Sequence, residues 1–271
     1  TIVATRNWKK VFQLVAEKPI RTISFSYITN TVAVGVDDGV LYLLSVPARS
    51  IIIYTTLDSD IKSISFSLRD ERLSVGCNDG TLRFFKMGAN MEPAGQIEPQ
   101  ESPMTHHTWS SQTLVVGRLD GTVSVYDSEK IFSNRFVPTY EIVSESPVRS
   151  LTFGVGGRCL SVVGDDGLVR IYSSKGGWVL CNQIDIGQCV FDSKWSPGGR
   201  YVVVSGGSFL RILDTLTWIR IDEVCRKLDD LFAGDGCTIS CLDWSMDGHF
   251  IAMGTTQTGP RVLSTTSWSL V

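Results

Sequence analysis

Apolar and polar positions repeat a short pattern along this chain, and its clearest copy spans residues 148–172. The alternation predicts a first strand over 148–154 and a second, apolar strand over 160–163, with a Gly-Gly pair turning the chain between them. Asp166-Gly167 follows, and Asp-Gly favours a two-residue hairpin loop because both central positions of that loop want a positive φ. The pattern therefore predicts three antiparallel strands joined by tight turns.

The same turn recurs at spacings of 41, 41 and 46 residues. The four copies are Asp38-Gly39, Asp79-Gly80, Asp120-Gly121 and Asp166-Gly167, and Gly206-Gly207 takes this place in a fifth repeat. An aromatic residue closes each first strand with a similar period, as Phe25, Phe66, Trp109, Phe153, Trp195 and Trp244. A period of about forty residues with four strands in each repeat is typical of propeller blades. We therefore predict an all-β propeller of four-stranded antiparallel blades.

The repeats predict a single β-propeller domain over residues 1–271. Residues 1–15 are predicted to be the tail strands of a partial blade, because two later segments share their layout of a strand, a Trp and another strand. Six repeats follow, at approximately 16–57, 58–98, 99–143, 144–185, 186–224 and 238–271, with an insertion at 225–237. Two strands and six four-stranded repeats predict seven blades, one of them incomplete in this chain. Three prolines in residues 88–103 predict a loop-like edge there.

The general pattern of the repeats is a hydrophobic-X-X-hydrophobic-X-aromatic run, most often followed by Ser, then Asp-Gly in four of the six repeats, and a third strand that ends near an aromatic residue. Examples of that end are Phe84-Phe85, Tyr126-Asp127 and Ile171-Tyr172. In these features the chain resembles the WD-repeat (WD40) β-propeller family over essentially its whole length. The repeats are divergent, because the Gly-His and Trp-Asp dipeptides of the family are absent.

The resemblance implies that the first strand of each blade is innermost and begins at the top face. In the family the N-terminal outer strand commonly completes the last blade, so the missing strand pair is expected after Val271 in the native protein. Without the family's usual His and Trp partners, the turn aspartates are expected to accept hydrogen bonds from nearby backbone N–H groups.

Charge and composition narrow the function classes. A net charge of −3 and a pI near 5.6 argue against a nucleic-acid binder that depends on a basic face. No apolar run approaches the roughly 20 residues that span a bilayer, so no membrane span is expected. Seven scattered cysteines fit free thiols in a reducing compartment, which predicts a cytoplasmic or nuclear protein. No cofactor is predicted.

No constellation in the sequence supports catalysis or metal binding. Adjacent His106 and His107 would point to opposite faces of a strand, and Cys237 and Cys241 lack the Cys-X-X-Cys spacing of a zinc site. The run 164–167 is one copy of the repeated hairpin and not a calcium loop. We therefore predict no catalytic residue, no metal site and no enzymatic activity.

One column of the repeats favours partner binding. The second residue of the first strand is Arg21, Lys62, Thr105, Arg149, Phe191 and Ser240 in the six repeats. The family topology would place these side chains around the mouth of the central channel, where the cations could bind an acidic segment and Phe191 could anchor an apolar one. The alternative is that each cation only offsets a neighbouring aspartate. Both alternatives stay open at this point.

The insertion 225–237 carries a second group of candidates. Val224, Leu228 and Leu231 have the spacing of one helical face, and Phe232 lies beside them. This segment is predicted either to cover a sheet edge or to contact a partner.

These observations predict a non-catalytic scaffold for protein–protein interaction within an intracellular multiprotein assembly. Its partner would be one or more proteins, bound on the top face through an acidic or apolar peptide or loop. Two alternatives compete with this hypothesis: a phosphoinositide- or membrane-binding propeller, which would need a concentrated basic patch, and an enzyme with an active site at the channel mouth.

Overall fold

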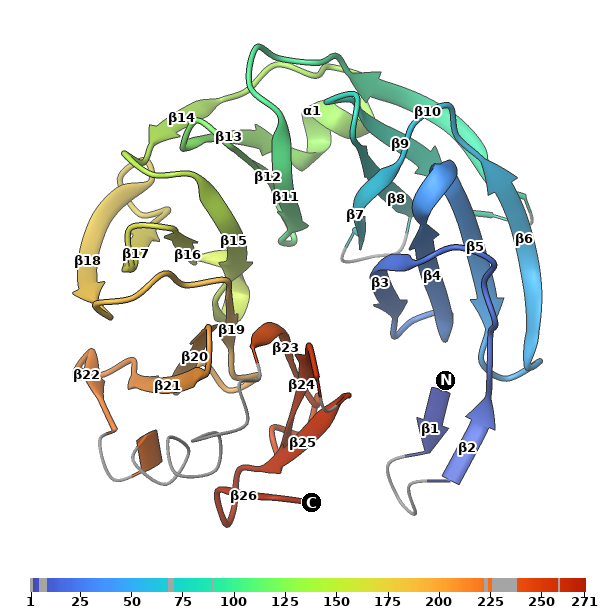
Figure 1. The fold of residues 1–271 in the computed structure, drawn as a ribbon. Coiled ribbons are helices and arrows are strands. Elements are labelled where there is room, and N and C mark those ends of the chain that lie inside the picture. The colour runs from blue at the N-terminus through green and yellow to red at the C-terminus, as the bar shows by residue number, and fades with distance from the viewer. Residues whose placement is uncertain are drawn as a thin grey trace. The chain divides into compact units, whose positions relative to one another are not determined.

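The computed structural model describes residues 2–4, 9–67, 71–88, 90–221, 224–225, 238–257 and 259–271. The chain forms two compact units, which are Thr1–Leu114 with Tyr126–Val137 and Val115–Val125 with Pro138–Val271. Antiparallel strands dominate both units (Figure 1).

The first part of the chain forms a two-stranded sheet and two four-stranded sheets. The two-stranded sheet consists of β1 (Ile2–Ala4) and β2 (Lys9–Phe12). Sheet one consists of β3 (Ile20–Ser26), β4 (Thr31–Val36), β5 (Val40–Ser45) and β6 (Ser50–Thr56). Sheet two consists of β7 (Ile61–Phe66), β8 (Arg72–Cys77), β9 (Leu82–Lys86) and β10 (Glu92–Ile97).

Four more four-stranded sheets follow, and in each the strand order follows the chain. Sheet three consists of β11 (Met104–Trp109), β12 (Thr113–Arg118), β13 (Thr122–Asp127) and β14 (Tyr140–Val143). Sheet four consists of β15 (Val148–Phe153), β16 (Cys159–Gly164), β17 (Leu168–Ser173) and β18 (Val179–Asp185). Sheet five consists of β19 (Asp192–Trp195), β20 (Tyr201–Gly206), β21 (Phe209–Asp214) and β22 (Ile219–Arg220). Sheet six consists of β23 (Ile239–Trp244), β24 (Phe250–Thr255), β25 (Arg261–Ser264) and β26 (Ser269–Leu270).

These sheets are the four-stranded antiparallel blades that the repeat pattern predicted. One local prediction was wrong. Residues 88–103 do not form a loop-like edge, because β10 pairs with β9 there despite Pro93. The register shifts just after that proline, and an edge strand tolerates a residue without an N–H group. The structure also contains the short helix α1 (Ser128–Phe132), whose first turn is capped by the carboxylate of Asp127.

Three of the four Asp-Gly turns differ from the predicted geometry, in which both residues have a positive φ. Both residues have a positive φ only at Asp38-Gly39. In the other three pairs only the glycine does, with φ of 85° at Gly80, 90° at Gly121 and 76° at Gly167. There the turn aspartate instead accepts a hydrogen bond from the backbone N–H two residues later, on Thr81, Thr122 or Leu168. The acceptor role predicted for these aspartates is therefore present, in a turn where only glycine takes a positive φ, which it does without steric strain.

Tryptophan residues fill a second recurring turn, between the third and fourth strands. Trp178, Trp218 and Trp268 have φ values of 57°, 56° and 53°, although a bulky residue rarely adopts this left-handed conformation. Ring contacts accompany it, with Trp178 packed on Phe153 and Trp218 on Trp195. These aromatic contacts offset the unfavourable backbone conformation.

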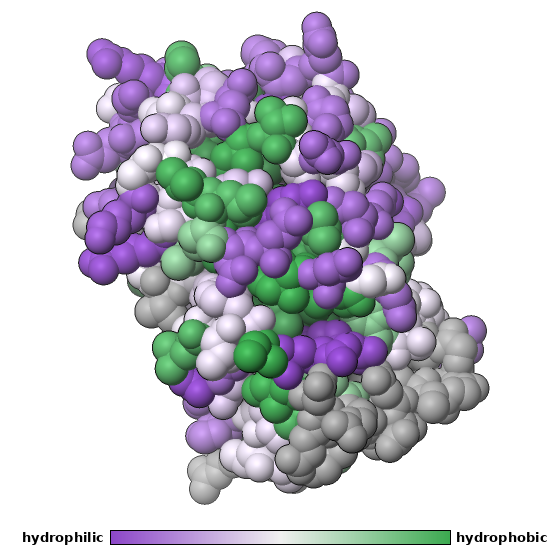
Figure 2. All heavy atoms as spheres, turned by 90° about the vertical axis from the view of Figure 1, so that its left-hand side faces the viewer, coloured by the Kyte–Doolittle hydropathy of each residue, from purple (hydrophilic) through white to green (hydrophobic). Residues whose placement is uncertain are grey.

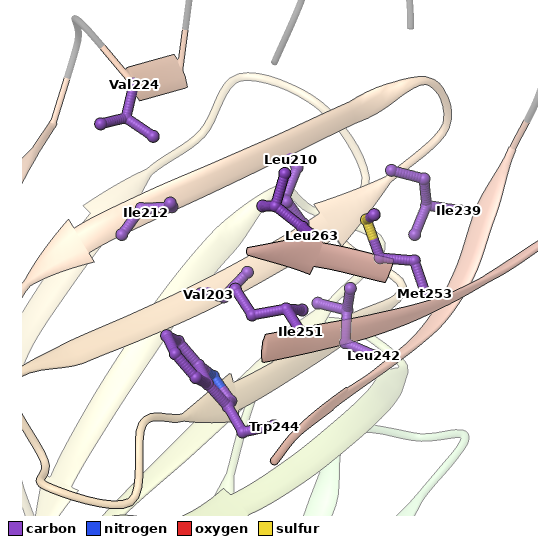
Figure 3. Packing of buried hydrophobic residues seen from close by; sticks show 10 residues of the cluster. All are labelled: Val203, Leu210, Ile212, Val224, Ile239, Leu242, Trp244, Ile251, Met253 and Leu263. Carbon is purple, nitrogen blue, oxygen red and sulfur yellow. The ribbon is translucent and has the colours of Figure 1, made fainter. Parts of the chain in front are cut away.

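The hydrophobic core lies where one sheet packs against the next. Figure 3 shows this for sheets five and six, where side chains of β20 and β21 meet those of β23, β24 and β25. The cluster comprises Val203, Leu210, Ile212, Val224, Ile239, Leu242, Trp244, Ile251, Met253 and Leu263. Successive repeats therefore stabilise one another, as expected for a fold in which no single repeat can bury its own apolar faces.

The outer strands keep some apolar side chains in solvent. Val143 on β14, Val179 and Leu180 on β18, and Ile219 on β22 are all exposed. Figure 2 views this side and shows hydrophobic residues separated by polar ones. Scattered apolar side chains of this kind are normal on a protein surface.

Candidate functional site

The first unit places two of the predicted cations at the start of its first strands. Arg21 on β3 donates Nε and Nη2 to the two carboxylate oxygens of Asp37, over 2.6 and 2.9 Å. Asp37 directly follows β4, so the ion pair joins the start of the first strand to the end of the second. Lys62, at the same place in sheet two, is exposed.

The second unit repeats this arrangement. Arg149 on β15 donates Nε and Nη2 to the carboxylate of Asp165, over 2.7 and 2.8 Å. Asp165 directly follows β16, as Asp37 follows β4. Phe191, the predicted apolar anchor, lies next to β19 and is half-buried, with its backbone N–H bonded to the carbonyl of Ser205.

Hydrogen bonds dominate the electrostatics of these pairs. The Arg21 guanidinium lowers the pKa of the Asp37 carboxyl, and Asp37 in turn raises the pKa of Arg21. The pKa of Arg149 is raised in the same way by its hydrogen bonds to Asp165. The Arg21–Asp37 pair is therefore charged in the folded protein near neutral pH.

The structure links these cations to aspartates that the sequence analysis had not singled out. Arg21 and Arg149 pair with the residue before each turn aspartate. The turn aspartates have cations of their own, since Asp38 contacts Lys18 and Asp166 contacts Arg170. The repeats themselves indicate this pairing. In the two repeats whose first strand carries arginine, an aspartate directly precedes the Asp-Gly turn, whereas in the repeat whose first strand carries Lys62 the residue before the turn is Asn78.

The insertion candidates Leu228, Leu231 and Phe232 lie outside the described residues. Val224 and Cys225, directly before them, are described and buried. Val224 belongs to the core cluster of sheets five and six.

Comparisons with known proteins agree with the sheet architecture. A family model described as "WD domain, G-beta repeat" matches residues 136–173. Among solved structures, 1846 chains match, so a match to one of them does not single out a function. One of them, from a "Crystal Structure of Mitotic Checkpoint Complex", is 17% identical, with 93% of this chain and 75% of that chain covered and a TM-score of 0.74. At this identity the likeness shows the fold alone. No curated protein matches the sequence.

The fold is a β-propeller of four-stranded antiparallel blades, and residues 136–173 match a WD repeat. Four of its six repeats carry the Asp-Gly turn.

A buried network of hydrogen bonds surrounds His107 in the first unit. Its Nδ1 lies 2.6 Å from Ser63 Oγ and its Nε2 lies 2.8 Å from Ser74 Oγ. The Ser74 hydroxyl donates its proton to the carbonyl of Ser65 and accepts from Trp109 Nε1. Ser74 can therefore only accept from His107, which assigns the ring proton to Nε2 and makes Nδ1 the acceptor from Ser63.

Burial of this ring lowers the pKa of His107 to about 3. The histidine is thus neutral near pH 7 and ties β11 to β7 and β8. The pattern of alternation had indicated that His106 and His107 face opposite ways, but nothing in it showed that His107 occupies a core position. Among the described residues no group of three or more His, Cys, Asp or Glu could hold a metal ion.

The sequence analysis also did not predict a group of charged residues on the first strands of the second unit, which consists of Asp192, Lys194 and Asp243. Buried Asp192 accepts hydrogen bonds from Ser150 Oγ and from the backbone N–H of Leu242, over 2.7 and 2.8 Å. These bonds connect sheets four, five and six. Burial alone would lower the pKa of nearby Lys194, but the carboxylates of Asp192 and Asp243 outweigh it and raise that pKa. The contacts of Asp192 thus link neighbouring strands.

A polar pocket of about 530 Å³ lies in the first unit, beside α1. Serine residues and the carboxylates of Glu71, Asp127 and Glu129 line it, together with Trp109 and Phe132. The rings of Trp109 and Phe132 stack with their centroids 6.1 Å apart, and the Arg72 guanidinium lies over Phe132. These aromatic faces are therefore already in contact with other side chains.

None of the helices in the described part of the chain is long and apolar enough to cross a membrane.

Proposed function

We propose that this propeller is a non-catalytic scaffold that binds a peptide or loop of a partner protein at the ends of its first strands. The observation that carries the proposal is the pair of exposed, pre-oriented guanidinium groups at Arg21 and Arg149. An arginine side chain has five N–H donors, and each aspartate occupies only two nitrogens. The remaining donors are available to an acidic side chain or a backbone carbonyl of a partner.

The ion pairs are those expected if each cation offsets a neighbouring aspartate, and they also orient the guanidinium groups for a partner. A flexible arginine loses side-chain entropy when a partner binds, and one already held by a bidentate pair loses less. The side chains of Arg21 and Arg149 remain 54% and 45% exposed despite these pairs. Lys62 and Phe191 would add a further charge and an apolar contact at equivalent positions. The insertion residues Leu228, Leu231 and Phe232 belong to the same proposal.

Two further observations support a scaffold in an intracellular assembly. The matching chain of the mitotic checkpoint complex belongs, by its title, to a multiprotein complex. All six cysteines among the described residues are free thiols, which supports the cytoplasm or nucleus.

Charge reversal at two of these positions tests the proposal. The variant Arg21→Glu/Arg149→Glu should recover partners at least about tenfold less well in affinity purification from native cells, because each change places a carboxylate against the partner and beside Asp37 or Asp165. The melting temperature should change little, since both ion pairs are at the surface. The measurement is quantitative mass spectrometry of captured proteins, with circular dichroism to confirm folding.

Arg200→Glu is the matched control. Arg200 is also half-exposed and also pairs with an aspartate, Asp214, but it lies in the loop between the first and second strands, at the opposite end of sheet five from Phe191. This variant should capture partners as the parent does. Undiminished recovery of every partner by a folded double variant would place the binding surface elsewhere.

A further inference from the structure

The polar pocket beside α1 lies where the first strands of sheets two and three end and their second strands begin. Ser67 and Glu71 border it between β7 and β8, and residues 110–112 border it between β11 and β12. The end of β13 and the helix α1 complete the lining. All of these residues belong to the first unit. In each of the two sheets this is the opposite end of the strands from the Asp-Gly turn.

The lining of this pocket is acidic. It contains the carboxylates of Glu71, Asp127 and Glu129, and none of the described lining residues is a cation. Lys130 and Arg72 are adjacent in the chain but are not part of the lining, and the Arg72 guanidinium donates to a backbone carbonyl of α1 over 3.3 Å. Asp127 accepts from backbone N–H groups of α1. The side chains of Glu71 and Glu129 have no partner within the described ranges, so both can bind a cation.

A buried hydroxyl independently indicates a ligand. Ser128 is only 4% exposed, and it lines the pocket. The hydroxyls of Ser67 and Ser110, which also line the pocket, already bond to the backbone. The Ser128 hydroxyl has no hydrogen-bond partner in the part of the chain that the structure describes. A buried polar group without a partner is unfavourable, so an occupant that bonds to this hydroxyl would be stabilised.

The chemistry of the lining favours an extended organic cation over a metal ion. No group of three or more His, Cys, Asp or Glu among the described residues could hold a metal ion, and the volume of about 530 Å³ has room for a long side chain. A guanidinium group has five N–H donors in a plane, so it can reach separate acceptors at once. A lysine ammonium is a compact point charge and serves separate acceptors less well. The rings of Trp109 and Phe132 offer apolar contact to the methylene groups of an arginine side chain.

We propose that this pocket binds an arginine side chain from a basic segment of a partner protein. Glu71 and Glu129 accept hydrogen bonds from the guanidinium group, and the Ser128 hydroxyl accepts a further one. Glu71, Ser111, Gln112 and Glu129 are exposed, so the pocket opens to the surface and the main chain of the partner can lie along its rim.

This site goes beyond the proposed function and does not depend on it. The guanidinium groups at the starts of the first strands would attract an acidic segment, whereas the pocket attracts a basic one at the other end of the strands. A scaffold with both sites could hold two partners of opposite charge. The variant Arg21→Glu/Arg149→Glu leaves every residue of the pocket unchanged, so each idea can fail without the other.

The probe is N-acetyl-arginine N-methylamide, a single arginine residue without terminal charges. We expect saturable shifts of the backbone amide signals of residues 110–112 and of α1 when this compound is titrated into the 271-residue protein and followed by NMR. The citrulline analogue has nearly the same shape without the charge, and the lysine analogue has the charge without the planar donors. Each should bind at least about fivefold more weakly.

Matched protein variants locate the binding. Glu71→Gln/Glu129→Gln should weaken it about tenfold, because two charge-assisted hydrogen bonds lose their acceptor charge. Ser128→Ala should weaken it about threefold without lowering the urea midpoint, because the hydroxyl has no partner in the free protein. Glu98→Gln/Glu101→Gln is the control, since it removes two exposed charges between β10 and β11, at the other end of the strands. This control should bind as the parent does.

Four results would overturn the proposal. They are the absence of saturable binding, equal binding of the citrulline or lysine analogue, undiminished binding by a folded Glu71→Gln/Glu129→Gln variant, and equal weakening by the control. The last result would show attraction to the overall negative charge rather than to the pocket.

Discussion

His107→Gln is expected to remove most of a pH dependence of stability that the parent protein shows between about pH 6.5 and pH 3. In the unfolded chain this ring has an ordinary pKa of 6.5, whereas in the folded protein its pKa is about 3. Between these values the unfolded state binds the proton and the folded state does not. Stability is therefore lost as the pH falls through this range, and at most about 1.4 kcal/mol is lost for each pH unit.

The measurement is urea unfolding of parent and variant at several pH values. Between pH 6.5 and about pH 4.5 the parent should lose about 2–3 kcal/mol of unfolding free energy through His107. The variant should lack this component. At pH 7 it should already be less stable by about 1–3 kcal/mol, because Gln cannot keep both hydroxyl contacts with Ser63 and Ser74.

An exposed histidine provides the control. His249 lies in the turn before β24 with its side chain in solvent, so His249→Gln should keep the parent's pH dependence. Parallel stability curves for the parent and His107→Gln would contradict the buried network.

Asp166→Ala should destabilise the protein by about 2–4 kcal/mol, more than the loss of a turn hydrogen bond alone would cost. Asp166 accepts from the N–H of Leu168 and also contacts Nη2 of Arg170 at 2.6 Å. The side chain of Arg170 is only 9% exposed, and its Nη1 is a buried nitrogen with no hydrogen-bond partner. Loss of the carboxylate would leave this charge unpaired in the protein interior.

Two further variants separate the turn from the ion pair, and all are compared by denaturant unfolding. Asp166→Asn keeps an acceptor for the Leu168 N–H but loses the charge, so it should recover only a small part of the loss. Asp166→Ala/Arg170→Met removes both charges and should be more stable than Asp166→Ala by about 1–3 kcal/mol. A double variant no more stable than Asp166→Ala would show that Arg170 does not depend on this pair.

The repeat pattern predicted where the turns lie but not their detailed backbone geometry. Asp-Gly at regular spacing was enough to predict the hairpins, because few residue pairs suit so tight a turn. The pattern did not distinguish a turn with two positive φ values from one with a single positive φ at glycine, since both accept Asp-Gly. Likewise, proline in residues 88–103 argued against a strand, but an edge strand can pair around Pro93.

The candidate site was predictable only in part. The repeat column located Arg21, Lys62, Arg149 and Phe191 at equivalent strand positions, because register follows from the period. It did not reveal that Arg21 binds Asp37 and Arg149 binds Asp165. Each pair lies 16 residues apart and meets only when the first two strands of a blade pair.

The sequence by itself determined the blade architecture, the strand order within each repeat and the turn positions, because these depend on local alternation and on residues suited to tight turns. Only the tertiary structure decided which side chains are buried. It placed His107 in the core between sheets two and three, and it left Ile23 exposed where the equivalent Ile64 is covered. The two isoleucines occupy the same position in nearly the same local sequence. Their environments differ because burial depends on the neighbouring sheet, which local sequence does not specify.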